Sequence, residues 1–348
     1  MTKKDIVEYC NSIGLDTIGF TKCRMLDELR PYYEYRKEKG LQNEFEEDNI
    51  DKRVNPRHYM PEAKTIISIA FPYLYSTSDD SAMNINGFSL YTRGLDYHRV
   101  VKKYLDMICD FISSKGYKTM GFVDSNTLPE RYIAYISGVG FIGKNGLIIT
   151  KKYGSYVFLG EILTSLELEE ENKINPEVLL DEISKYSKCG SCTICYDNCK
   201  TKAINRSSEN KCYQSPGNPN ICSSYITQKK DLSDKEIKLL KGKVFGCDDC
   251  QIRCPYNKRA HKSGLKEFTP LETMNRDTIE YAMMNNSFFK EGVNISSCGW
   301  RGKNVIKRNS IIKLLGENEG IKDISSDSEY INTYIDRVKN MNSDNTSF

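Results

Sequence analysis

Nine of the 13 cysteines lie between residues 189 and 254, and their spacing is the strongest chemical pattern in the chain. The first run has the form C-x2-C-x2-C-x3-C. In bacterial ferredoxins this spacing directs three thiolates at three irons of one cluster, while the fourth thiolate points toward a second cluster. The run therefore predicts two 4Fe-4S clusters. Its members are Cys189, Cys192, Cys195 and Cys199.

A second run, C-x2-C-x3-C-P at residues 247–255, is one cysteine short of the full motif. Either Cys222 or Cys212 must supply the missing ligand, because the Ser-Pro-Gly-Asn-Pro stretch between them leaves both within reach. We expect Cys222. Exchange of the fourth ligands between the runs then predicts one cluster on Cys189, Cys192, Cys195 and Cys254. The other cluster is expected on Cys199, Cys222, Cys247 and Cys250.

Zinc and disulfides are the two alternative uses of so many cysteines. Zinc sites built on the two C-x2-C pairs would leave Cys195, Cys199 and Cys254 without a function. Disulfides are rare in the cytosol, where we expect this chain, because no run approaches the roughly 20 apolar residues of a membrane span. We therefore expect a cytoplasmic protein without a membrane segment. The isolated cysteines are expected to be small apolar core residues: Cys10, Cys23, Cys109 and Cys298.

Composition and charge point to a globular protein with a basic half. Hydrophobic residues make up 39% and charged residues 28% of 348 residues, which is long enough for two or three domains. The net charge is −4 over residues 1–187 and +7 over residues 188–348. A basic stretch beside the cysteines suits a polyanion such as nucleic acid, and an ordinary solvated face fits the charge equally well. The candidate phosphate contacts are Lys229, Lys230, Lys258 and Arg259.

The elements that must position these residues begin with an α/β layer domain, because helical and strand patterns alternate over the first 165 residues. An acidic linker at 167–175 follows, and the chain beyond Lys262 is expected to be helical and polar. Ligand sites of layered domains lie where strand ends meet helix starts. Helices are expected at 4–13, 96–114 and 129–138, and strands at 17–20, 65–73, 119–123, 147–150 and 156–166.

Several further motifs together resemble those of the epoxyqueuosine reductase family of tRNA-modifying enzymes. The central motif is FVDS at 122–125, followed by Glu130-Arg131 and by GVGFIGKN at 138–145. The resemblance covers roughly residues 1 to 315. Its other motifs are KRVNP at 52–56, GLDYH at 94–98, YGSY at 153–156, CGSCT at 189–193, YIT at 225–227, GCDDCQ at 246–251 and GWRG at 299–302.

The resemblance implies a cobalamin held beside a cluster, from which cob(I)alamin reduces epoxyqueuosine to queuosine in a tRNA anticodon. It makes Asp124 the proton donor for the leaving oxygen. The residue itself supports this role, since a partly desolvated carboxyl group at the end of a strand can have its pKa raised enough to act as a general acid. A helix N-cap or a turn anchor is the more ordinary use of such an aspartate.

The resemblance also implies cofactor contacts. Tyr97 and His98 lie where the family contacts the corrinoid. Because the family binds cobalamin without a lower axial ligand, His98 is expected to form hydrogen bonds and not to bind cobalt. Further candidates, whose alternative use is in salt bridges and turns, are Arg53, Lys144, Ser224 and Asp248.

Contacts with tRNA are expected in the basic half of the chain. Trp300 and Arg301 can stack on bases or bind phosphate, and a core position is the alternative for Trp300. Lys303, Lys307 and Arg308 add further cations. Longer members of the family continue into HEAT-like repeats that help to hold the tRNA, whereas about 30 polar residues follow Leu315 here.

The expected protein thus has an α+β fold in three parts. Residues 1–170 would form the α/β cobalamin-binding domain, 171–265 a ferredoxin-like domain with both clusters, and 266–348 a short helical segment. We expect a monomer that acts on tRNA carrying epoxyqueuosine and takes electrons from an external low-potential reductant such as flavodoxin or ferredoxin. Two alternatives stay open: a corrinoid iron-sulfur reductase of a small molecule, similar to reductive dehalogenases, and a two-cluster ferredoxin-type electron carrier.

Overall fold

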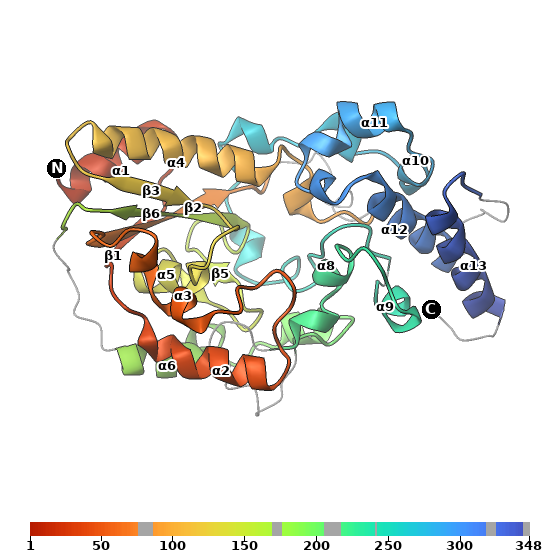
Figure 1. The fold of residues 1–348 in the computed structure, drawn as a ribbon, viewed down its shortest axis with the longest axis horizontal. Coiled ribbons are helices and arrows are strands. Elements are labelled where there is room, and N and C mark those ends of the chain that lie inside the picture. Colours follow the sequence, from red (N-terminus) through yellow and green to blue (C-terminus); the bar gives the residue numbers. More distant parts are fainter. Residues whose placement is uncertain (76–85, 169–175, 205–216, 241, 318–324, 344–348) are drawn as a thin grey trace.

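The computed structural model describes residues 1–75, 86–168, 176–204, 217–240, 242–317 and 325–343. A four-stranded sheet lies on the left in Figure 1, with the order β1-β2-β6-β3. All three pairings are antiparallel, a direction that the alternation of helices and strands did not decide. The strands are β1 (Ile18–Lys22), β2 (Thr65–Pro72), β3 (Thr119–Phe122) and β6 (Val157–Thr164).

Helices cover the sheet and build the rest of the molecule (Figure 1). In the first part of the chain they are α1 (Lys3–Ser12), α2 (Arg30–Glu38), α3 (Ile50–Val54), α4 (Tyr97–Ser113) and α5 (Glu130–Ile136). The cysteine region contains α6 (Pro176–Lys185), α7 (Ile194–Asn198), α8 (Ser223–Ile226) and α9 (Asp234–Leu239). The last part contains α10 (Thr278–Ala282), α11 (Asn286–Glu291), α12 (Lys303–Gly316) and α13 (Glu329–Ser343).

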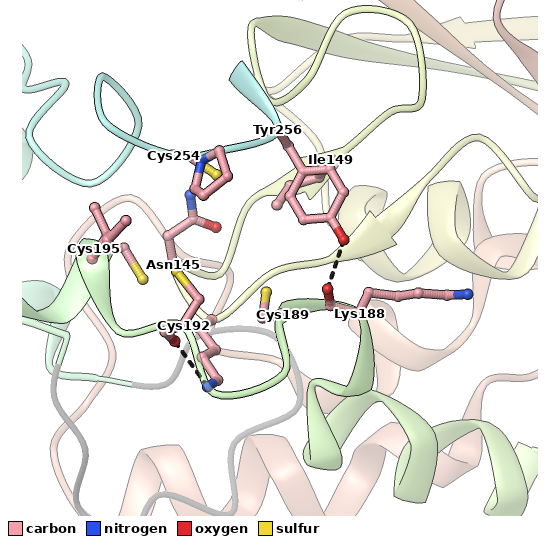
Figure 2. Close-up of a pocket in the computed structure, with 11 residues that line it drawn as sticks. Asn145, Ile149, Lys188, Cys189, Cys192, Cys195, Cys254 and Tyr256 are labelled. Atoms are coloured by element: carbon pink, nitrogen blue, oxygen red, sulfur yellow. Dashed lines mark hydrogen bonds between the residues drawn. The ribbon is translucent and has the colours of Figure 1, made fainter. Parts of the chain in front are cut away.

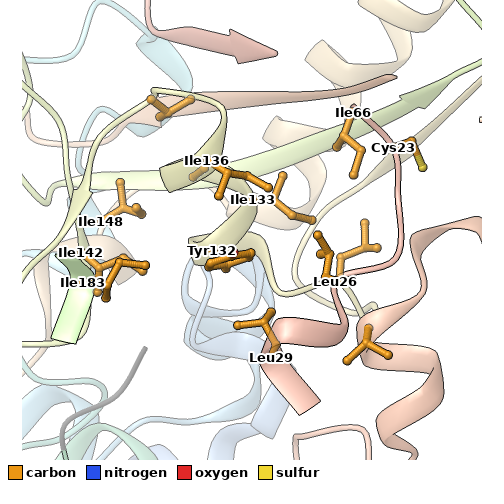
Figure 3. Packing of buried hydrophobic residues seen from close by; sticks show 14 of the residues in the cluster. Cys23, Leu26, Leu29, Ile66, Tyr132, Ile133, Ile136, Ile142, Ile148 and Ile183 are labelled. Atoms are coloured by element: carbon orange, nitrogen blue, oxygen red, sulfur yellow. The ribbon is translucent and has the colours of Figure 1, made fainter. Parts of the chain in front are cut away.

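The sheet separates two hydrophobic cores, because successive side chains of a strand point to opposite faces. On β2, Ile67 and Phe71 pack into the core that also contains buried residues of α1 and α4. Ile66 packs into the other core, where Tyr132 and Ile133 of α5 lie (Figure 3). All eight residues of β2 are buried, as its nearly unbroken apolar sequence predicts. The prediction of buried isolated cysteines is confirmed for three of them: Cys10, Cys23 and Cys298.

Two of the predicted elements differ from the observed ones. The strand expected at 147–150 shrinks to β5 (Ile148–Ile149), which pairs with β4 (Phe141–Ile142) in a separate two-stranded sheet. The C-terminal part is helical as predicted, but α12 is buried along most of its length. Its residues form a core with α8, α9 and α13, so this part is better packed than its polar composition suggested.

The three expected parts are joined by pairings that span long stretches of sequence. Phe88 forms a parallel bridge with Phe245, and Leu95 forms an antiparallel bridge with Ser296. Phe88 and Phe245 also share one buried cluster with Met274. The segment before α4 is therefore held by both the cysteine region and the C-terminal part. Among the described helices, none has both the length and the apolar character required to cross a bilayer.

Candidate active site

Four of the predicted cluster ligands surround one cavity of about 280 Å³. Three of them come from the first cysteine run, around the start of α7, and the fourth comes from the end of the second run. Figure 2 shows them around the hollow, with Asn145 and Tyr256 beside them. The crossing of ligands between the runs is therefore the observed arrangement around this cavity. The four thiols are those of Cys189, Cys192, Cys195 and Cys254.

This cavity suits an iron-sulfur cluster better than a single metal ion. Tetrahedral zinc draws each sulfur to about 2.3 Å from the metal, so its ligands form a compact group. Among the described residues, no three His, Cys, Asp or Glu side chains are grouped to hold one ion. Four thiols spread around a hollow match a cubane cluster, which has a volume of its own. The observed spacing therefore favours iron over zinc.

The other four predicted ligands also lie close to one another, since their charges act on each other's pKa. Burial raises the pKa of Cys222, and the charge of Cys199 adds to the rise. Burial likewise raises the pKa of Cys250, with contributions from Cys247 and Cys222. A smaller contribution from Cys195 shows that the two thiol sets are neighbours. The alternative ligand Cys212 lies outside the described residues.

Polar contacts fix the cysteine loops to the first part of the chain. Lys144 donates from Nζ to the carbonyl oxygens of Gly190 (2.6 Å) and Cys192 (3.0 Å). Asn145 donates from Nδ2 to the carbonyl oxygen of Cys250 at 3.3 Å. The side chains of Lys144 and Asn145 thereby tie both cysteine runs to the GKN segment. The predicted cofactor contact Lys144 thus lies at the cavity of the first thiol set.

Asp124 meets two of the residues predicted to lie beside it. Its Oδ2 accepts hydrogen bonds from the hydroxyl group of Tyr97 and, at 3.1 Å, from Nε2 of His98. Nδ1 of His98 lies 2.9 Å from Oδ1 of Asp96, the N-cap of α4. Asp124 follows β3, so a strand end and a helix start meet here as expected. The Asp124 side chain is 55% exposed, which leaves it open to a substrate.

The protonation of this group differs from the prediction. Burial raises the pKa of Asp124, but the hydrogen bonds from His98 and Tyr97 outweigh burial and lower it below the usual value. Burial lowers the pKa of His98, while the hydrogen bonds and charges of Asp124 and Asp96 raise it to about 9. The expected rise for Asp124 is therefore wrong in this arrangement, because neighbours in the fold overcome desolvation. At neutral pH the proton resides on His98.

His98 has the hydrogen-bonding role that was expected of it, since both ring nitrogens are engaged by carboxylates. Next to it, the ring of Tyr97 stacks on that of Phe158 with centroids 4.2 Å apart. Tyr91 meets Tyr97 edge-on at 6.5 Å. Burial raises the pKa of Tyr91, and a hydrogen bond with Ser224 opposes the rise. The aromatic residues Tyr91 and Phe158, which sequence reasoning missed, connect Asp124 to Ser224 in the cysteine region.

Two carboxyl groups lie behind Asp124, and sequence reasoning assigned a role to neither of them. Glu130, the first residue of α5, accepts hydrogen bonds from the Asp124 backbone N–H and from the Asn126 side chain. Glu161 on β6 is fully buried, and its Oε1 accepts a hydrogen bond from Ser68 at 3.3 Å. Two signals pointed to Glu130: its place in the central family motif and its position at a helix start directly after Pro129. A single charged residue within the mostly apolar strand 157–164 was the signal for Glu161.

Two other predicted cofactor contacts are engaged inside the protein. Asp248 is fully buried, and its carboxyl group accepts hydrogen bonds from the Ser89 hydroxyl (2.6 Å) and the Leu90 backbone N–H (2.8 Å). Arg53 pairs with Glu46 at 3.0 Å and lies over the ring of Tyr33. The geometry thus gives both residues anchoring roles, and their contact with a cofactor stays a prediction.

The predicted phosphate contacts differ in their exposure to solvent and in their ion pairs. Lys230, Lys258 and Arg259 are exposed. Lys229 pairs with Glu236 at 2.5 Å and is only 28% exposed. The suggestion that Arg308 adds a surface cation is wrong, because Arg308 is fully buried. It donates hydrogen bonds to the backbone carbonyl oxygens of residues 229 and 230 and so holds the Lys229-Lys230 segment in place.

Trp300 lies in an exposed aromatic group and not in the core. Its side chain is 54% exposed, and its ring meets that of Phe45 edge-on at 5.9 Å. Phe45 in turn meets Tyr225 at 5.4 Å. The guanidinium group of Arg301 lies 4.1 Å from the Trp300 ring centroid and also pairs with Glu44. Residues far apart in the sequence thus form one surface, the aromatic platform, of Phe45, Tyr225, Trp300 and Arg301.

Two family models match the chain. One, described as epoxyqueuosine reductase QueG, DUF1730, covers residues 53–125. The other, described as a 4Fe-4S double cluster binding domain, covers residues 188–257. The second range includes both cysteine runs and Cys222. The domain model therefore supports the prediction of two 4Fe-4S clusters in this region.

Whole-chain relatives carry the same name. Epoxyqueuosine reductase of Bacillus subtilis is 34% identical over 90% of this chain and 78% of its own length. That of Staphylococcus aureus is 33% identical over 91% of this chain and 80% of its own length. At these identities and coverages, the relation extends through both the sheet and the cysteine region.

Solved structures agree in fold. Epoxyqueuosine reductase from Streptococcus thermophilus has a TM-score of 0.78 at 28% identity, covering 98% of this chain and 99% of that one. A structure with an epoxyqueuosine-modified tRNA-Tyr stem loop has a TM-score of 0.81 at 31% identity, covering 97% and 90%. In a third, from Bacillus subtilis, the catalytic aspartate loop is swung out of the active site (TM-score 0.78, 29% identity, 97% and 98%). The chain therefore belongs to the epoxyqueuosine reductase family of oxidoreductases.

Proposed function

We propose that this chain reduces epoxyqueuosine to queuosine at the wobble position of a tRNA anticodon. The reaction consumes two electrons and two protons and releases the epoxide oxygen as water. The observation that carries the proposal is the open Asp124 carboxylate, hydrogen-bonded to His98, in a chain that also holds two neighbouring sets of four thiols. The relative solved with an epoxyqueuosine-modified stem loop supports the substrate.

The electron path would consist of two 4Fe-4S clusters with interleaved ligands. We assign the first cluster to the four thiols that line the cavity, and their spread around it fits a cubane. The second cluster is assigned to the neighbouring set, with Cys222 in place of the missing ligand of the second run. An external low-potential reductant such as flavodoxin or ferredoxin would supply the electrons. The second set is Cys199, Cys222, Cys247 and Cys250.

Cobalamin is the proposed organic cofactor. When bound as cob(I)alamin, it supplies a nucleophile and two-electron reductant for an epoxide carbon. The residues that would hold it are Tyr97, His98 and Ser224, with Arg53, Lys144 and Asp248 as more distant supports. The first three are only partly buried, and Tyr91 joins them into one wall. Phenolic, imidazole and hydroxyl groups on such a wall suit the amide-rich edge of a corrin ring.

The proton for the leaving oxygen would pass through Asp124. Its carboxylate is the exposed member of the network, whereas the His98 side chain is 34% exposed and lies behind it. His98 carries the proton at neutral pH and donates to Asp124 Oδ2. Burial and the Asp124 charge raise the pKa of Tyr97, so the phenol also stays protonated and donates to the same oxygen. A proton can thus pass from His98 through the Asp124 carboxylate to a developing alkoxide, which leaves His98 neutral until it is protonated again.

The tRNA would be held by charge and by stacking. Lys230, Lys258 and Arg259 are exposed and suit phosphate contacts, with Lys229 in support. Trp300 and Arg301 would contribute through the aromatic platform, on which an unpaired base can stack. This platform also favours a tRNA substrate over a small molecule. We further propose that the protein acts in the cytoplasm as a monomer, with cofactor, cluster and helical parts at residues 1–170, 171–265 and 266–348.

One experiment tests the proposal directly. The protein, reconstituted with iron and sulfide and reduced, is incubated with cobalamin and tRNA that carries epoxyqueuosine. Mass spectrometry of the anticodon nucleosides should then find queuosine, with a loss of one oxygen atom from the substrate. Omission of cobalamin is the control that separates this enzyme from an electron carrier. Unchanged epoxyqueuosine in the complete mixture would refute the function.

A further inference from the structure

The loop that carries Asp124 contains a left-handed turn that is held by hydrogen bonds with neighbouring groups. Asp124 has a φ of 51°, in the left-handed region. Side chains other than glycine, asparagine and aspartate rarely adopt this region, because Cβ approaches the following carbonyl oxygen. The loop joins β3 to α5, and Asp124 itself is exposed to solvent. Packing alone therefore leaves this turn without strong support.

One oxygen atom of Glu130 provides that support. Its Oε1 accepts the Asp124 backbone N–H at 2.9 Å and the Asn126 side-chain N–H at 2.7 Å. Asn126 in turn accepts the Leu128 backbone N–H at 2.7 Å through its own Oδ1. The two sides of the turn are thus joined at a single carboxylate. Glu130 is itself held firmly, because Tyr132, Ile133 and Ala134 in the same helix α5 are fully buried.

The surroundings of Glu130 are acidic and poorly hydrated. Glu161 approaches from β6, where it is the pairing partner of Phe122 at the end of β3, and its Oε2 is buried without a hydrogen-bond partner among the described residues. Burial and the Asp124 charge raise the pKa of Glu130 to about 7, and Asn126 and Arg131 oppose the rise. Burial and the Glu130 charge raise the pKa of Glu161 well above its usual value. Glu130 therefore accepts the hydrogen bonds of the loop, although burial and the nearby Asp124 charge disfavour its ionised form.

We propose that Glu130 is a positioning residue of this active site, whose carboxylate holds the Asp124 loop in the left-handed turn that presents Asp124 to Tyr97 and His98. Glu130 acts through the Asp124 backbone and transfers no proton to the substrate. Loss of its acceptor releases residues 123–126, while Thr127 stays bound to Tyr59 and Lys52, so that the carboxylate of Asp124 moves away from Tyr97 and His98. This role of Glu130 rests on the proposed function, because a displaced Asp124 lowers turnover only if Asp124 takes part in the reaction.

Hydrogen exchange measured by mass spectrometry tests the structural part without any cofactor. In Glu130→Ala the peptide that contains residues 123–128 should exchange at least tenfold faster than in the wild type, because the Asp124 amide has lost its acceptor. Glu130→Gln should restore most of the protection, since its Oε1 can accept the same two hydrogen bonds. Glu182→Ala is the matched control: Glu182 accepts a hydrogen bond from Tyr135 of α5 and does not contact the loop.

Two exchange results would overturn the proposal. One is wild-type exchange of the loop in Glu130→Ala. The other is faster exchange throughout β2 and β6, which would mean that the substitution loosens the whole sheet. Turnover of epoxyqueuosine tRNA is then compared among the same variants: Glu130→Ala should lose about 100-fold in kcat with KM for tRNA within threefold, and Glu130→Gln should recover most of it. A wild type without turnover would refute the proposed function and leave the exchange result on Glu130 standing.

Discussion

At the scale of single residues, the site depends on which group carries a proton. The carboxyl of Asp124 is the plausible acid from sequence alone, yet in the fold its hydrogen bonds with His98 and Tyr97 favour the ionised form. His98 lies between two carboxylates and therefore holds its proton well above its ordinary pKa of 6.5. The acid is thus the pair of Asp124 and His98 and not one residue.

Asp124→Asn is expected to lower turnover by about 10²- to 10⁴-fold, the usual contribution of a positioned proton donor. An amide can accept the hydrogen bond from Tyr97 but cannot pass on a proton. Iron content and the visible spectrum should match the wild type, because Asp124 touches neither thiol set. Asp110→Asn, an exposed change on α4, serves as the control and should keep full turnover. Equal turnover in Asp124→Asn and Asp110→Asn would remove Asp124 from the mechanism.

The pH dependence of kcat should report His98. Its pKa of about 9 in the fold means that the proton is present at neutral pH and is lost as the pH rises through about 9. We therefore expect kcat to fall on the alkaline side with a midpoint near pH 9, and His98→Gln to lose most activity together with that limb. The same shift stabilises the fold fully below about pH 6.5, and this contribution also disappears as the pH passes 9. An identical alkaline limb in wild type and His98→Gln would assign it to another group.

At the scale of elements, the ends of helices position the side chains of the active site. The N-cap of α4 places Asp96 against His98, and the first residue of α5 holds the Asp124 turn. In the C-terminal part, α12 performs the same task for the cysteine region. Arg308 of α12 reaches the backbone of residues 229 and 230, which follow α8. The polar residues of α12, among them Arg308 and Asn309, are therefore buried and form hydrogen bonds inside the protein.

Arg308→Met should lower the free energy of unfolding by on the order of 3 kcal/mol, because the backbone carbonyl groups of residues 229 and 230 lose the hydrogen bonds that the fully buried Arg308 donates. Chemical denaturation of the intact protein measures this change. Lys307→Met, one residue earlier on the same helix and partly exposed, is the control and should change stability by less than about 0.5 kcal/mol. If the two variants were equally stable, the Arg308 contacts would not anchor the segment.

At the scale of the whole molecule, residues from distant parts of the chain complete each site. The cavity of the first thiol set combines a loop near residue 190 with Cys254, while Lys144 closes it from the sheet side. The aromatic platform combines Phe45, Tyr225 and Trp300. Phe88, Phe245 and Met274 pack in one buried cluster, so the three expected parts of the chain share a core. Neither site exists in any one part alone.

Iron analysis of single-cysteine variants tests the ligand sets. Cys222→Ser should lose the second cluster, and iron per chain should fall to about half of the wild-type value after reconstitution. Cys212→Ser is the matched comparison, because Cys212 is the other cysteine between the two runs, and it should keep the full iron content. The opposite pattern, with iron lost only in Cys212→Ser, would exchange the two residues in the assignment.

Binding of tRNA should separate stacking from charge. Trp300→Ala should weaken binding by about 1–3 kcal/mol with an unchanged dependence on salt, because it removes a stacking ring and no charge. Lys230→Ala should make the plot of log K against log salt shallower by about 0.7 to 0.9, the value for one phosphate contact. Lys4→Ala, on α1 at the other end of the molecule, is the control (Figure 1). A Lys230→Ala slope equal to that of Lys4→Ala would exclude this contact.

The features that depend on local spacing could be predicted from the amino-acid sequence. Cysteine intervals predicted two interleaved thiol sets, and the continuous apolar run of β2 predicted a strand buried on both faces. Through the resemblance to the family, the GLDYH and FVDS motifs implied that Tyr97, His98 and Asp124 belong to one site, and they lie together in the fold. Such features are visible because ligand spacing, strand burial and motif order are properties of neighbouring residues.

Features that depend on residues distant in the chain could be seen only in the folded protein. It determined the antiparallel strand directions, the burial of Arg308, the exposure of Trp300 and the support of Asp124 by Glu130. It also reversed the expected pKa shift of Asp124, because the charges that act on a carboxyl group come from whichever side chains the fold brings within a few ångströms. The spacing of cysteines along the chain therefore predicts which thiols can bind one cluster. The protonation of Asp124 and His98 depends instead on the charged and hydrogen-bonding groups that the fold places around them.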